Sequence, residues 1–595
     1  MDDKRPVAGP NRRDVLRGAL AAGIGLAATA PVAGATHPRR TPWLRTGGGR
    51  TVAVFGGGVA GLSAAHELAE RGYRVTVYEP SFLGGKARSM PVPGTAGGGR
   101  LDLPGEHGFR FFPGCYQNVP ELMSRIPFPG NPNGVADNLI RVEGTVAGFR
   151  GKPPIFVPVE LGAIDQLTPQ RLQNSIIGGS SFIPELPPAE LAFFGKQMMM
   201  WFTSCEERRF GQWEHMTWEQ ALRAEGKSAA YRNYLVSALT RITVAAKPHM
   251  SSARTIGTIG EALVLAGTGL IPEYSGGIDR ILNRPTNEAW IDPWVEYLRS
   301  RGVRFVLGQG ASRFEMRGGL VSSVRTSGPG GSNTVTADWY LCAAPVDRTV
   351  ALLNTSVLDA DPSLGGMRNL ITDWMVGIQY YLRTPTELPE GHIAALGTPW
   401  ALTALRQAPM WVGDFAARYG DGSVRECLSV DISDWDTPGI RYGRTAKQCS
   451  KEEIAAETWT QLKEWLNTGT GWLRDEDVHS WHLDPGITWN GGAIDNATPL
   501  LVNTVGSYAD RPYSHCAIPN LFFGGDHVRN HIDLATMEGA NESGRTAANA
   551  IMDAADDPGS RAPVFPLVRL PIFEAAKAVD ADRYRAGLPH LLDLV

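Results

Sequence analysis

The chain has 595 residues, of which 43% are hydrophobic and 20% charged, so it can bury a large core and is not a disordered protein. Its formal net charge of −4 is small for this length, and no basic excess points to a nucleic-acid partner. The six cysteines lie far apart, without CxxC or Cys/His ligand spacing, so we expect mostly buried free thiols rather than a disulfide framework.

Residues 1–35 have the composition of an export signal. Arg12 and Arg13 precede an apolar run of small residues that ends in "AGA" at 33–35. The stretch "NRRDVLR" resembles the twin-arginine signature, whose cargo crosses the membrane folded and often with a cofactor inside. We therefore expect cleavage after Ala35, an exported protein and a cofactor site. The alternative is an ordinary secretory signal with a basic cap.

The stretch 51–61, "TVAVFGGGVAG", predicts a dinucleotide site. A short buried strand runs directly into Gly56, Gly58 and Gly61, which are in GxGxxG register. The first glycine permits a sharp turn, the second lets backbone approach a pyrophosphate, and the third packs the following helix against the strand. A lone GxGxxG is weak evidence, so the flanking elements decide the assignment.

Those flanking elements are present. Val59 and Ala60 open a helix, indicated by apolar residues at helical spacing, and its free N–H groups can face the phosphates. The next strand, "RVTVYE", ends at Glu79, whose carboxylate can accept hydrogen bonds from both hydroxyls of a ribose. Strand, loop, helix, strand and acid in this order predict dinucleotide binding.

The next segment, "EPSFLGGKARS" at 79–89, selects between FAD and NAD. A second glycine pair, Gly84 and Gly85, and the basic Lys86 follow the ribose acid closely. This arrangement resembles the FAD signature of the flavin amine oxidase and phytoene desaturase superfamily, in which many members carry arginine at the position of Lys86. The resemblance implies that FAD is the cofactor and that Lys86 meets the pyrophosphate charge. The alternative is a glycine turn with a surface lysine.

The stretch "GEHGFRFFPGCYQNVPELM" at 105–123 is similar to a segment of plant-type phytoene and zeta-carotene desaturases. The resemblance places Gly108, Phe109 and Arg110 beside the cofactor. The family usually has histidine where this chain has Arg110. We expect the arginine to hold an anionic flavin or a substrate oxygen, or, in a purely structural role, to pair with an acid.

The stretch "NLFFGGDHVRNHIDLATMEGANESGRTAANAI" at 520–551 resembles the closing FAD motif of the same superfamily. The resemblance implies that Asp526, after Gly525, bonds the ribitol, and that Met537 and the start of its helix meet the flavin ring and phosphates. A helix N-terminus beside the ring also stabilises negative charge on a reduced flavin.

The matched segments are separated by two long stretches without such motifs, as expected of a substrate domain inserted into a cofactor domain. The fold class is therefore α/β: a glycine-loop, Rossmann-like FAD domain made of discontinuous segments, with an inserted mixed α+β substrate domain. The expected units are a twin-arginine signal peptide at 1–35, an FAD domain at 50–124, 265–349 and 500–555, a substrate domain at 125–264 and 350–499, and a tail at 556–595.

Two local patterns have both a functional and a structural interpretation. Residues 191–202, rich in methionine and aromatics, could line a lipophilic site, but we favour a buried helix. His479/His482 and His527/His531 have spacings that suit a metal. Because no further ligand is near, we expect no metal site and favour polar or cofactor-lining roles.

The resemblance implies an FAD-dependent oxidoreductase, a desaturase or dehydrogenase, that moves a hydride from a lipophilic, isoprenoid-like substrate to flavin. We also expect peripheral membrane contact; no pattern indicates an oligomeric state or a catalytic side chain. The alternatives are a flavin amine oxidase releasing hydrogen peroxide, a flavin-bound isomerase without net redox chemistry, and a binding protein without turnover. The loop before Met537, residues 533–536, lacks the aromatic that helps to cage the amine in the amine oxidase branch.

Overall fold

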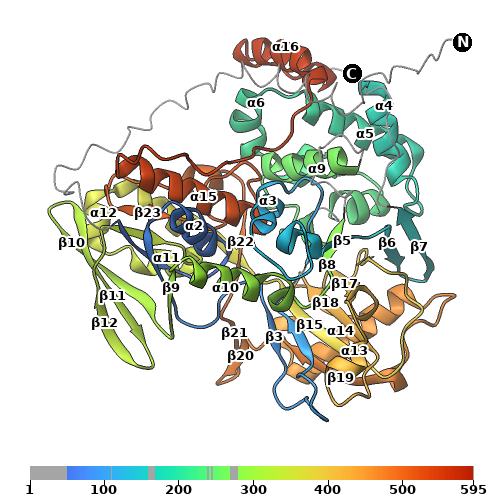
Figure 1. The fold of residues 1–595 in the computed structure, drawn as a ribbon. Helices are drawn as coiled ribbons and strands as arrows, with labels where there is room; N and C mark the ends of the chain where they lie inside the picture. The colour runs from blue at the N-terminus through green and yellow to red at the C-terminus, as the bar shows by residue number, and fades with distance from the viewer. Residues whose placement is uncertain are drawn as a thin grey trace, which may run out of the picture. The chain divides into compact units, whose positions relative to one another are not determined.

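The computed structural model of the chain describes residues 50–108, 110–158, 168–237, 240–242, 245–267 and 279–593. The expected signal peptide, with Arg12 and Arg13, and the candidate residue Phe109 lie outside these ranges. The described elements fall into a parallel sheet that carries the glycine loop, a larger mixed sheet, and a group of helices (Figure 1).

The parallel sheet has five strands in the order β23-β13-β1-β2-β9. All neighbouring strands are parallel. Each parallel pair needs a crossover connection of a dozen or more residues, so long stretches of chain lie between strands that are neighbours in the sheet. Four of the five residues of β1 are buried. A strand of a parallel sheet that is covered on both faces has an almost continuous apolar sequence, as this strand does. The strands are β1 (Thr51–Phe55), β2 (Arg74–Glu79), β9 (Arg304–Leu307), β13 (Trp339–Cys342) and β23 (Leu521–Phe523).

Two helices follow the strands at the centre and edge of this sheet and pack against each other (Figure 1). Helix α2 (Val59–Glu70) follows β1, and α15 (Met537–Ala554) follows β23. Their backbones approach so closely that a methyl group built at Gly544 would lie 2.3 Å from the carbonyl oxygen of Ala60. This contact brings the first and the closing glycine motifs of the sequence together.

A three-stranded antiparallel sheet extends from the parallel sheet. Its second connection is the Gly328–Gly331 turn, a glycine- and proline-rich sequence of the kind that favours tight hairpin turns. Helix α10 (Asp292–Ser300) leads into β9. The other elements here are β10 (Gly310–Arg317), β11 (Leu320–Gly328), β12 (Gly331–Val335), α11 (Val346–Leu352) and α12 (Thr355–Ala360).

The larger sheet has seven strands in the order β19-β15-β18-β17-β16-β6-β7. All neighbours are antiparallel except β16 and β6, so two distant parts of the chain meet at that pair. Helix α14 (Lys451–Leu466) buries its apolar face on the sheet, with Trp459 and Leu462 in the shared core. The strands are β6 (Gly144–Phe149), β7 (Lys152–Pro158), β15 (Val376–Leu382), β16 (His392–Ala395), β17 (Leu402–Arg406), β18 (Glu426–Ile432) and β19 (Val478–Leu483).

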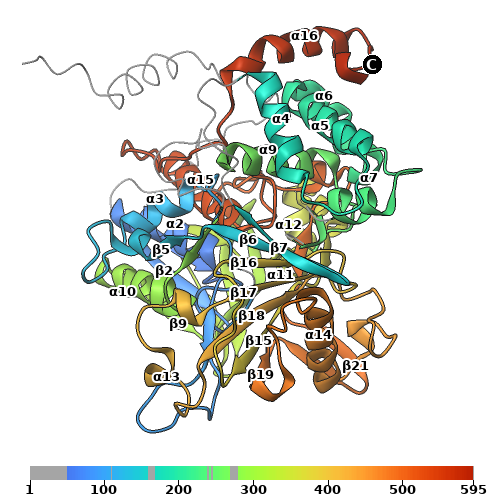
Figure 2. The same cartoon turned by 90° about the vertical axis from the view of Figure 1, so that its right-hand side faces the viewer.

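The helices between β7 and β8 form a group that α16 joins from the far end of the chain (Figure 2). The segment rich in methionine and aromatics is part of α5, and Met198, Met199 and Met200 are all buried. Phe573, just before α16, stacks on Phe202 of α5. The helices are α4 (Pro169–Ser180), α5 (Pro188–Thr203), α6 (Glu206–Gly211), α7 (Trp218–Ala221), α9 (Ala253–Gly267) and α16 (Glu574–Arg585).

Short elements connect these parts. They are β3 (Ser89–Pro91), β4 (Pro104–Glu106), α3 (Asn118–Ser124), β5 (Leu139–Arg141), β8 (Arg280–Leu282), β14 (Ile371–Asp373), α13 (Phe415–Arg418), β20 (Ile487–Asn490), β21 (Ala493–Asn496) and β22 (Leu500–Val502). All six cysteines are free thiols, and five of them are buried. In the part of the chain that the structure describes, no helix combines the length and the apolar character needed to span a bilayer.

Candidate cofactor site

The turn after β1 is fixed by glycine at two positions. The N–H of Gly56 donates to the carbonyl of Tyr78 at 2.9 Å, and its φ of +122° favours glycine. A methyl group built at Gly61 would lie 2.0 Å from the carbonyl oxygen of Gly56, so the start of α2 can approach the turn only without a side chain. The turning and packing roles predicted for Gly56 and Gly61 thus have a direct steric basis.

The second glycine pair closes the loop from the other side. The N–H of Gly84 donates to the carbonyl of Gly57 at 2.8 Å, and a methyl group built at Gly85 would lie 2.9 Å from the Cα of Gly58. In contrast, a methyl group built at Gly58 would meet only one described atom within 4 Å, the Cα of Gly85 at 3.7 Å. The backbone at Gly58 is therefore open on the side where a pyrophosphate is expected.

The N-terminus of α2 has no capping side chain. Val59 and Ala60 are buried in its first turn, and their N–H groups have no partner within the helix because of their position. An uncapped helix N-terminus beside a glycine turn fits a phosphate group.

The carboxylate of Glu79 is buried at the end of β2 and faces the glycine loop. One oxygen accepts from the N–H of Gly57 at 2.8 Å, and the other accepts from the N–H and hydroxyl of Ser81 at 2.9 and 3.0 Å. An ionised carboxylate offers about four acceptor positions, so room remains for a ribose hydroxyl. Glu79 thus orients the loop as well as offering a ribose contact.

The two basic residues after Gly85 have different environments. The ammonium of Lys86 donates to the carbonyl of Pro499, so in this structure it points to the chain before β22. Its contact with a pyrophosphate stays a prediction. Arg88 is buried, donates from Nη1 to the carbonyl of Gly85 at 2.6 Å, and leaves Nε without a hydrogen-bond partner among the described residues.

Gly108 and Arg110 lie between the parallel sheet and the seven-stranded sheet. Arg110 is buried, with Nε 2.9 Å from the Thr286 hydroxyl and 3.3 Å from the Glu106 carboxylate, and with Nη2 2.8 Å from the carbonyl of Arg88. Burial raises the pKa of Glu106, an effect that the nearby Arg110 opposes. The structural role expected for Arg110, pairing with an acid, is the one these contacts display.

A second buried polar pair lies beside this one. His107 and Asp484, which follows β19, are both buried, and Nδ1 is 2.7 Å from the carboxylate. Burial lowers the pKa of His107. Burial acts to raise the pKa of Asp484, but the hydrogen bond and charge interaction with His107, the N–H of Gly486 and the charge of Arg88 together outweigh it and hold that pKa below its usual value. A neutral imidazole therefore donates to an ionised carboxylate.

A small cavity opens between this segment and the seven-stranded sheet, and both polar and apolar residues line it. It is lined by Gly108, Arg110, Thr403, Ala404, Leu405, Gln407, Ser429, Val430 and Asp431. A methyl group built at Gly108 would lie 3.8 Å from the Asp431 carboxylate, which places β18 directly opposite the Gly108 backbone. The long apolar substrate pocket that a lipophilic substrate requires stays a prediction.

The closing motif forms a loop whose backbone carbonyls are hydrogen-bonded to Arg511. This fully buried guanidinium donates to the carbonyls of Asp526, His527 and Val528 at 3.0, 3.0 and 2.7 Å. It also pairs with Asp533, which is buried at a φ of +51° and accepts from Arg254 and Thr255 as well. The shape of the Gly525–Asp526 turn thus depends on a buried ionic cluster.

Helix α15 begins directly after this loop. Thr536 caps it by accepting from the N–H of Gly539 at 3.0 Å, and the following Met537 is partly buried. The carboxylate of Glu538 instead accepts from the N–H groups of Gln117, Asn118 and Val119 at 2.7–2.9 Å, so it caps α3. The Met-Glu pair therefore joins the closing motif to the segment at 105–123.

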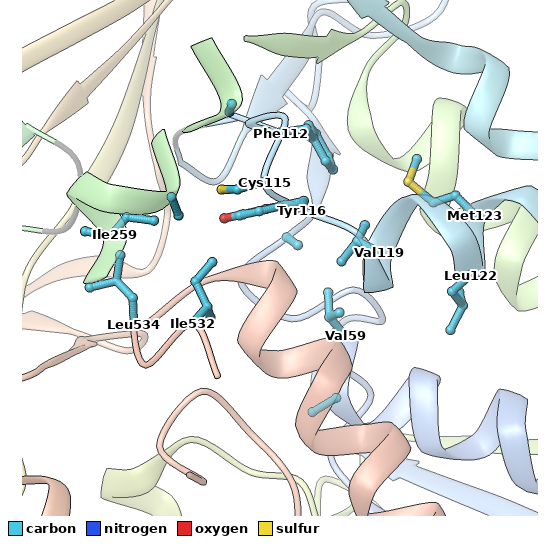
Figure 3. Close-up of a cluster of buried hydrophobic side chains, with 14 of the residues drawn as sticks. Val59, Phe112, Cys115, Tyr116, Val119, Leu122, Met123, Ile259, Ile532 and Leu534 are labelled. Carbon is cyan, nitrogen blue, oxygen red and sulfur yellow. The ribbon is translucent and has the colours of Figure 1, made fainter. Parts of the chain in front are cut away.

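Aliphatic side chains of the loop before α15 face the residues before α3. Figure 3 shows Cys115 and Tyr116 opposite Ile259 of α9 and opposite Ile532 and Leu534. All five belong to one buried cluster. Asp533 lies between the two aliphatic residues but pairs with arginines, so this loop presents hydrocarbon to the interior.

The sequence motifs located the glycine turns, Glu79 and the closing loop, but not the residues that hold them. Arg511 and Asp484 each follow an element without a recognised motif, and their partners, the carbonyl of Asp526 and the ring of His107, lie 15 and 377 positions away; Asp431, in β18, lines the cavity opposite Gly108. The only local signal was their charge inside apolar segments such as "LSVDIS". In the described ranges, no three His, Cys, Asp or Glu side chains gather in a way that could hold a metal ion.

A flavin nucleotide fits these residues. The glycine cradle leaves backbone open at Gly58, α2 lacks a capping side chain, and the ring of His527 beside Gly525 is buried with both nitrogens unsatisfied. The chain belongs to the flavin-containing amine oxidoreductase family, whose model matches residues 59–552. It is a flavin-dependent oxidoreductase with an α/β fold that joins a Rossmann-like domain to a substrate domain.

Individual relatives share this organisation. The chain is 23% identical over 541 residues to a 15-cis-phytoene desaturase from Synechococcus elongatus, covering 87% of this chain and 98% of the relative. It is 25% identical over 337 residues to a carotenoid φ-ring synthase from Chlorobaculum tepidum; this match covers 53% of the chain and spans about half, 47%, of that relative. Cyclohexylamine oxidase from Brevibacterium oxydans has a similar fold, with a TM-score of 0.55 at 14% identity over 86% of this chain and 100% of that one.

Proposed function

We propose that the chain is an FAD-dependent desaturase or dehydrogenase that takes a hydride from a lipophilic, isoprenoid-like substrate. The observation that carries the proposal is the similarity to the 15-cis-phytoene desaturase, which extends over 87% of this chain and nearly all of that relative. The φ-ring synthase points to the same chemical class of substrate, since both names refer to carotenoids or their precursors.

The loop before α15 supports a hydrocarbon substrate over an amine. Ile532 and Leu534 face a buried aliphatic and aromatic cluster (Figure 3). Asp533, the one acid here, is held by two arginines and a threonine rather than facing a site. The loop thus brings hydrocarbon side chains and an already paired acid, and no aromatic at 533–536, to the start of α15; burying an apolar substrate is worth roughly 25 cal/mol per Å² of its apolar surface.

FAD, when bound, supplies the hydride acceptor. The residues that would hold it are Glu79, which would offer an acceptor to the ribose, and Val59 and Ala60, whose amides at the uncapped start of α2 would be available to the phosphates. Residues of β17 and β18 lie opposite Gly108 and Arg110 across the small cavity beside this segment. No residue is assigned here as a nucleophile, because hydride transfer needs none.

The proposal is tested by mixing the purified yellow protein anaerobically with two panels of compounds. One panel contains apolar alkenes, including linear polyenes, and the other contains primary amines. Bleaching of the flavin by the apolar panel alone supports the proposal. Bleaching by simple amines alone would overturn it in favour of an amine oxidase, and turnover of a polyene without bleaching would favour an isomerase.

We further propose that Arg12 and Arg13 direct export of the folded, flavin-loaded protein by the twin-arginine route. A cofactor protein fits this route because the flavin must be inserted before the chain leaves the cytoplasm. Replacing both arginines by lysine keeps the charge and should leave yellow precursor inside the cell. Export that persists in this variant would show that the ordinary secretory route is used.

Peripheral contact with a membrane would give such an enzyme access to a lipophilic substrate. Ile572, Val579, Leu588 and Leu591, around α16, expose 40–53% of their surface. Flotation of the protein with liposomes, compared with a variant carrying serine at these four positions, tests this contact. Equal flotation of the two proteins would exclude this segment.

A further inference from the structure

A cavity of about 160 Å³ lies among α6, α9 and the chain that leads to α16. Its lining comes from α6, α9, Tyr508, residues 530–531 of the closing loop and residues 566–569. None of these residues belongs to the glycine loop or lines the small cavity at Gly108. A protein cavity of this size admits an organic molecule as large as a single ring, so it can hold a ligand of its own.

Arg254 of α9 is held in a fixed position in this lining. Its Nε donates to Glu214 and its Nη2 donates to Asp533, and neither acid is part of the lining. Its guanidinium carbon lies 4.6 Å from the centre of the Phe210 ring and 4.4 Å from that of Tyr508. Among the described residues nothing accepts from Nη1, which is not one of the fully buried atoms and so retains accessible surface. Arg254 therefore has one donor nitrogen available to a ligand.

Two further donors belong to the same lining. Arg209 of α6 is 4% exposed, and its Nη2 donates to the carbonyl of Trp201 and to Glu261. Its Nη1 has no acceptor in the described part of the chain and retains accessible surface, as does the hydroxyl of Tyr508. Donors from three separate side chains suit an anion with several oxygens, and a phosphate offers more acceptor oxygens than a carboxylate.

The charged side chains of the lining are three arginines and two glutamates, with a histidine in addition. Glu206 pairs with Arg569 at 2.5 Å and Glu261 pairs with Arg209 at 2.7 Å, so each acid is already matched by a base. Arg254 has no acidic partner within the lining. The wall of the cavity thus carries an excess of positive charge, which favours an anion over a cation.

Part of the wall is hydrocarbon. Ala262 of α9 and Leu567 and Val568, which precede α16, line the cavity together with the charged groups. Ile572, a few positions after Val568, is 40% exposed and belongs to the exposed apolar residues around α16. A ligand that matches both parts of the wall has an anionic head and an apolar chain.

We propose that this cavity binds a phosphate ester with an apolar chain, whose oxygens accept from Arg254, Arg209 and Tyr508. Two sources share this chemistry, the head group of a phospholipid and a soluble phosphate ester. The site is additional to the flavin and substrate sites proposed above, and it depends on neither of them.

The test uses the flavin-loaded protein, so that bound FAD occupies the glycine loop. Isothermal titration calorimetry measures the Kd for hexyl phosphate, inorganic phosphate and hexyltrimethylammonium. Hexyl phosphate should bind at least about 10-fold more tightly than inorganic phosphate, because its chain buries apolar surface. The ammonium compound, with the same chain and the opposite charge, should not bind.

Three variants locate the binding. Tyr508→Phe keeps the ring beside Arg254 and removes only the hydroxyl, so the unfolding temperature should stay near that of wild type while the Kd for hexyl phosphate rises about 10-fold. Arg569→Gln leaves Glu206 unpaired in the lining and should raise the Kd about 2–5-fold. Arg585→Gln is the matched control: Arg585 pairs with Glu207 and is similarly exposed but lies outside the lining, so its Kd should be unchanged.

The inference is wrong if hexyl phosphate does not bind, or if the ammonium compound binds equally well. It is also wrong if Arg585→Gln weakens binding as much as Arg569→Gln does, since the attraction would then be general, or if neither Tyr508→Phe nor Arg569→Gln changes the Kd. Flotation with phosphatidylglycerol vesicles separates the two sources. Flotation that falls in Tyr508→Phe assigns the site to a lipid head group, and unchanged flotation with weaker binding of hexyl phosphate assigns it to a soluble ester.

Discussion

At the carboxyl ends of β1 and β2, the parallel sheet faces the cofactor site with glycine backbone, whereas the seven-stranded sheet lines its cavity with polar and apolar side chains. On the first side, close contacts are between main-chain atoms, as at Gly56, Gly61 and Gly85. On the second side, Thr403, Ser429 and Asp431 line the cavity. The glycine loop thus depends on backbone shape, whereas side chains shape the cavity of the seven-stranded sheet.

Substitutions on the two sides should therefore have different effects on stability and flavin binding. We expect the larger losses of both for substitutions in the glycine loop. Gly61→Ala places a methyl group 2.0 Å from the Gly56 carbonyl, so the turn or the helix must move. We expect a loss of about 3 kcal/mol or more in stability together with loss of flavin, measured by denaturant unfolding and the flavin absorbance. Gly178→Ala in α4, with no atom within 4 Å of the new methyl group, is the control and should be neutral or slightly stabilising. Similar behaviour of the two variants would contradict the steric argument.

Beside the seven-stranded sheet, Asp484→Asn should reduce the free energy of unfolding by less than Gly61→Ala does. It should leave the conformation of the glycine loop unchanged. The change weakens the charge-assisted hydrogen bond with His107 and the bond from the N–H of Gly486, both 2.7 Å long. We expect a loss of about 2–3 kcal/mol in the free energy of unfolding, with flavin affinity little changed. Denaturant unfolding of the holoprotein and a flavin titration measure the two quantities. Loss of flavin in proportion to stability would show that the two sides are not separate.

Glu79→Gln affects binding more than folding, since one amide oxygen can still accept from a backbone N–H. The lost charge should weaken FAD binding by about 1–3 kcal/mol, seen as a higher Kd in the fluorescence titration. Ser81→Ala removes only the 3.0 Å hydroxyl contact to the same carboxylate and should leave the Kd near wild type. If the serine variant binds as weakly as the glutamine variant, Glu79 acts by holding its own loop and not by contacting the ribose.

The smallest effect is expected at His531, on the surface of the closing loop. Its hydrogen bond with Glu542 raises the pKa of this histidine above the ordinary value of 6.5. A raised folded pKa adds stability that is present below pH 6.5 and lost as the pH rises through the folded value. Because the side chain is half exposed, the contribution should stay below about 1 kcal/mol. The unfolding temperatures of wild type and His531→Gln should differ slightly at pH 6 and converge at pH 8; a larger gap at pH 8 would reverse the assigned sign.

The difference between the two sides also decides what could be predicted from the sequence. Glycine turns leave a local signature, so β1, the turn at Gly56–Gly61, β2 and the start of α15 could all be located before the structure. The buried pairs could not, because His107 and Asp484 lie 377 positions apart and Arg110 reaches Thr286 across 176. The sequence around His107 or Arg110 contains no pattern that predicts the distant residue with which it pairs. The same holds for Arg511, whose role appears only when the closing loop is folded around it.

The cap that Glu538 gives to α3 joins residues 420 positions apart, and β13 lies between β1 and β23 in the parallel sheet. A ribosome that has made the glycine loop must still make most of the protein before α15 can complete the cradle. We therefore expect a chain interrupted before α15 to hold flavin less tightly than the full chain, because it lacks both the closing loop and the cap on α3.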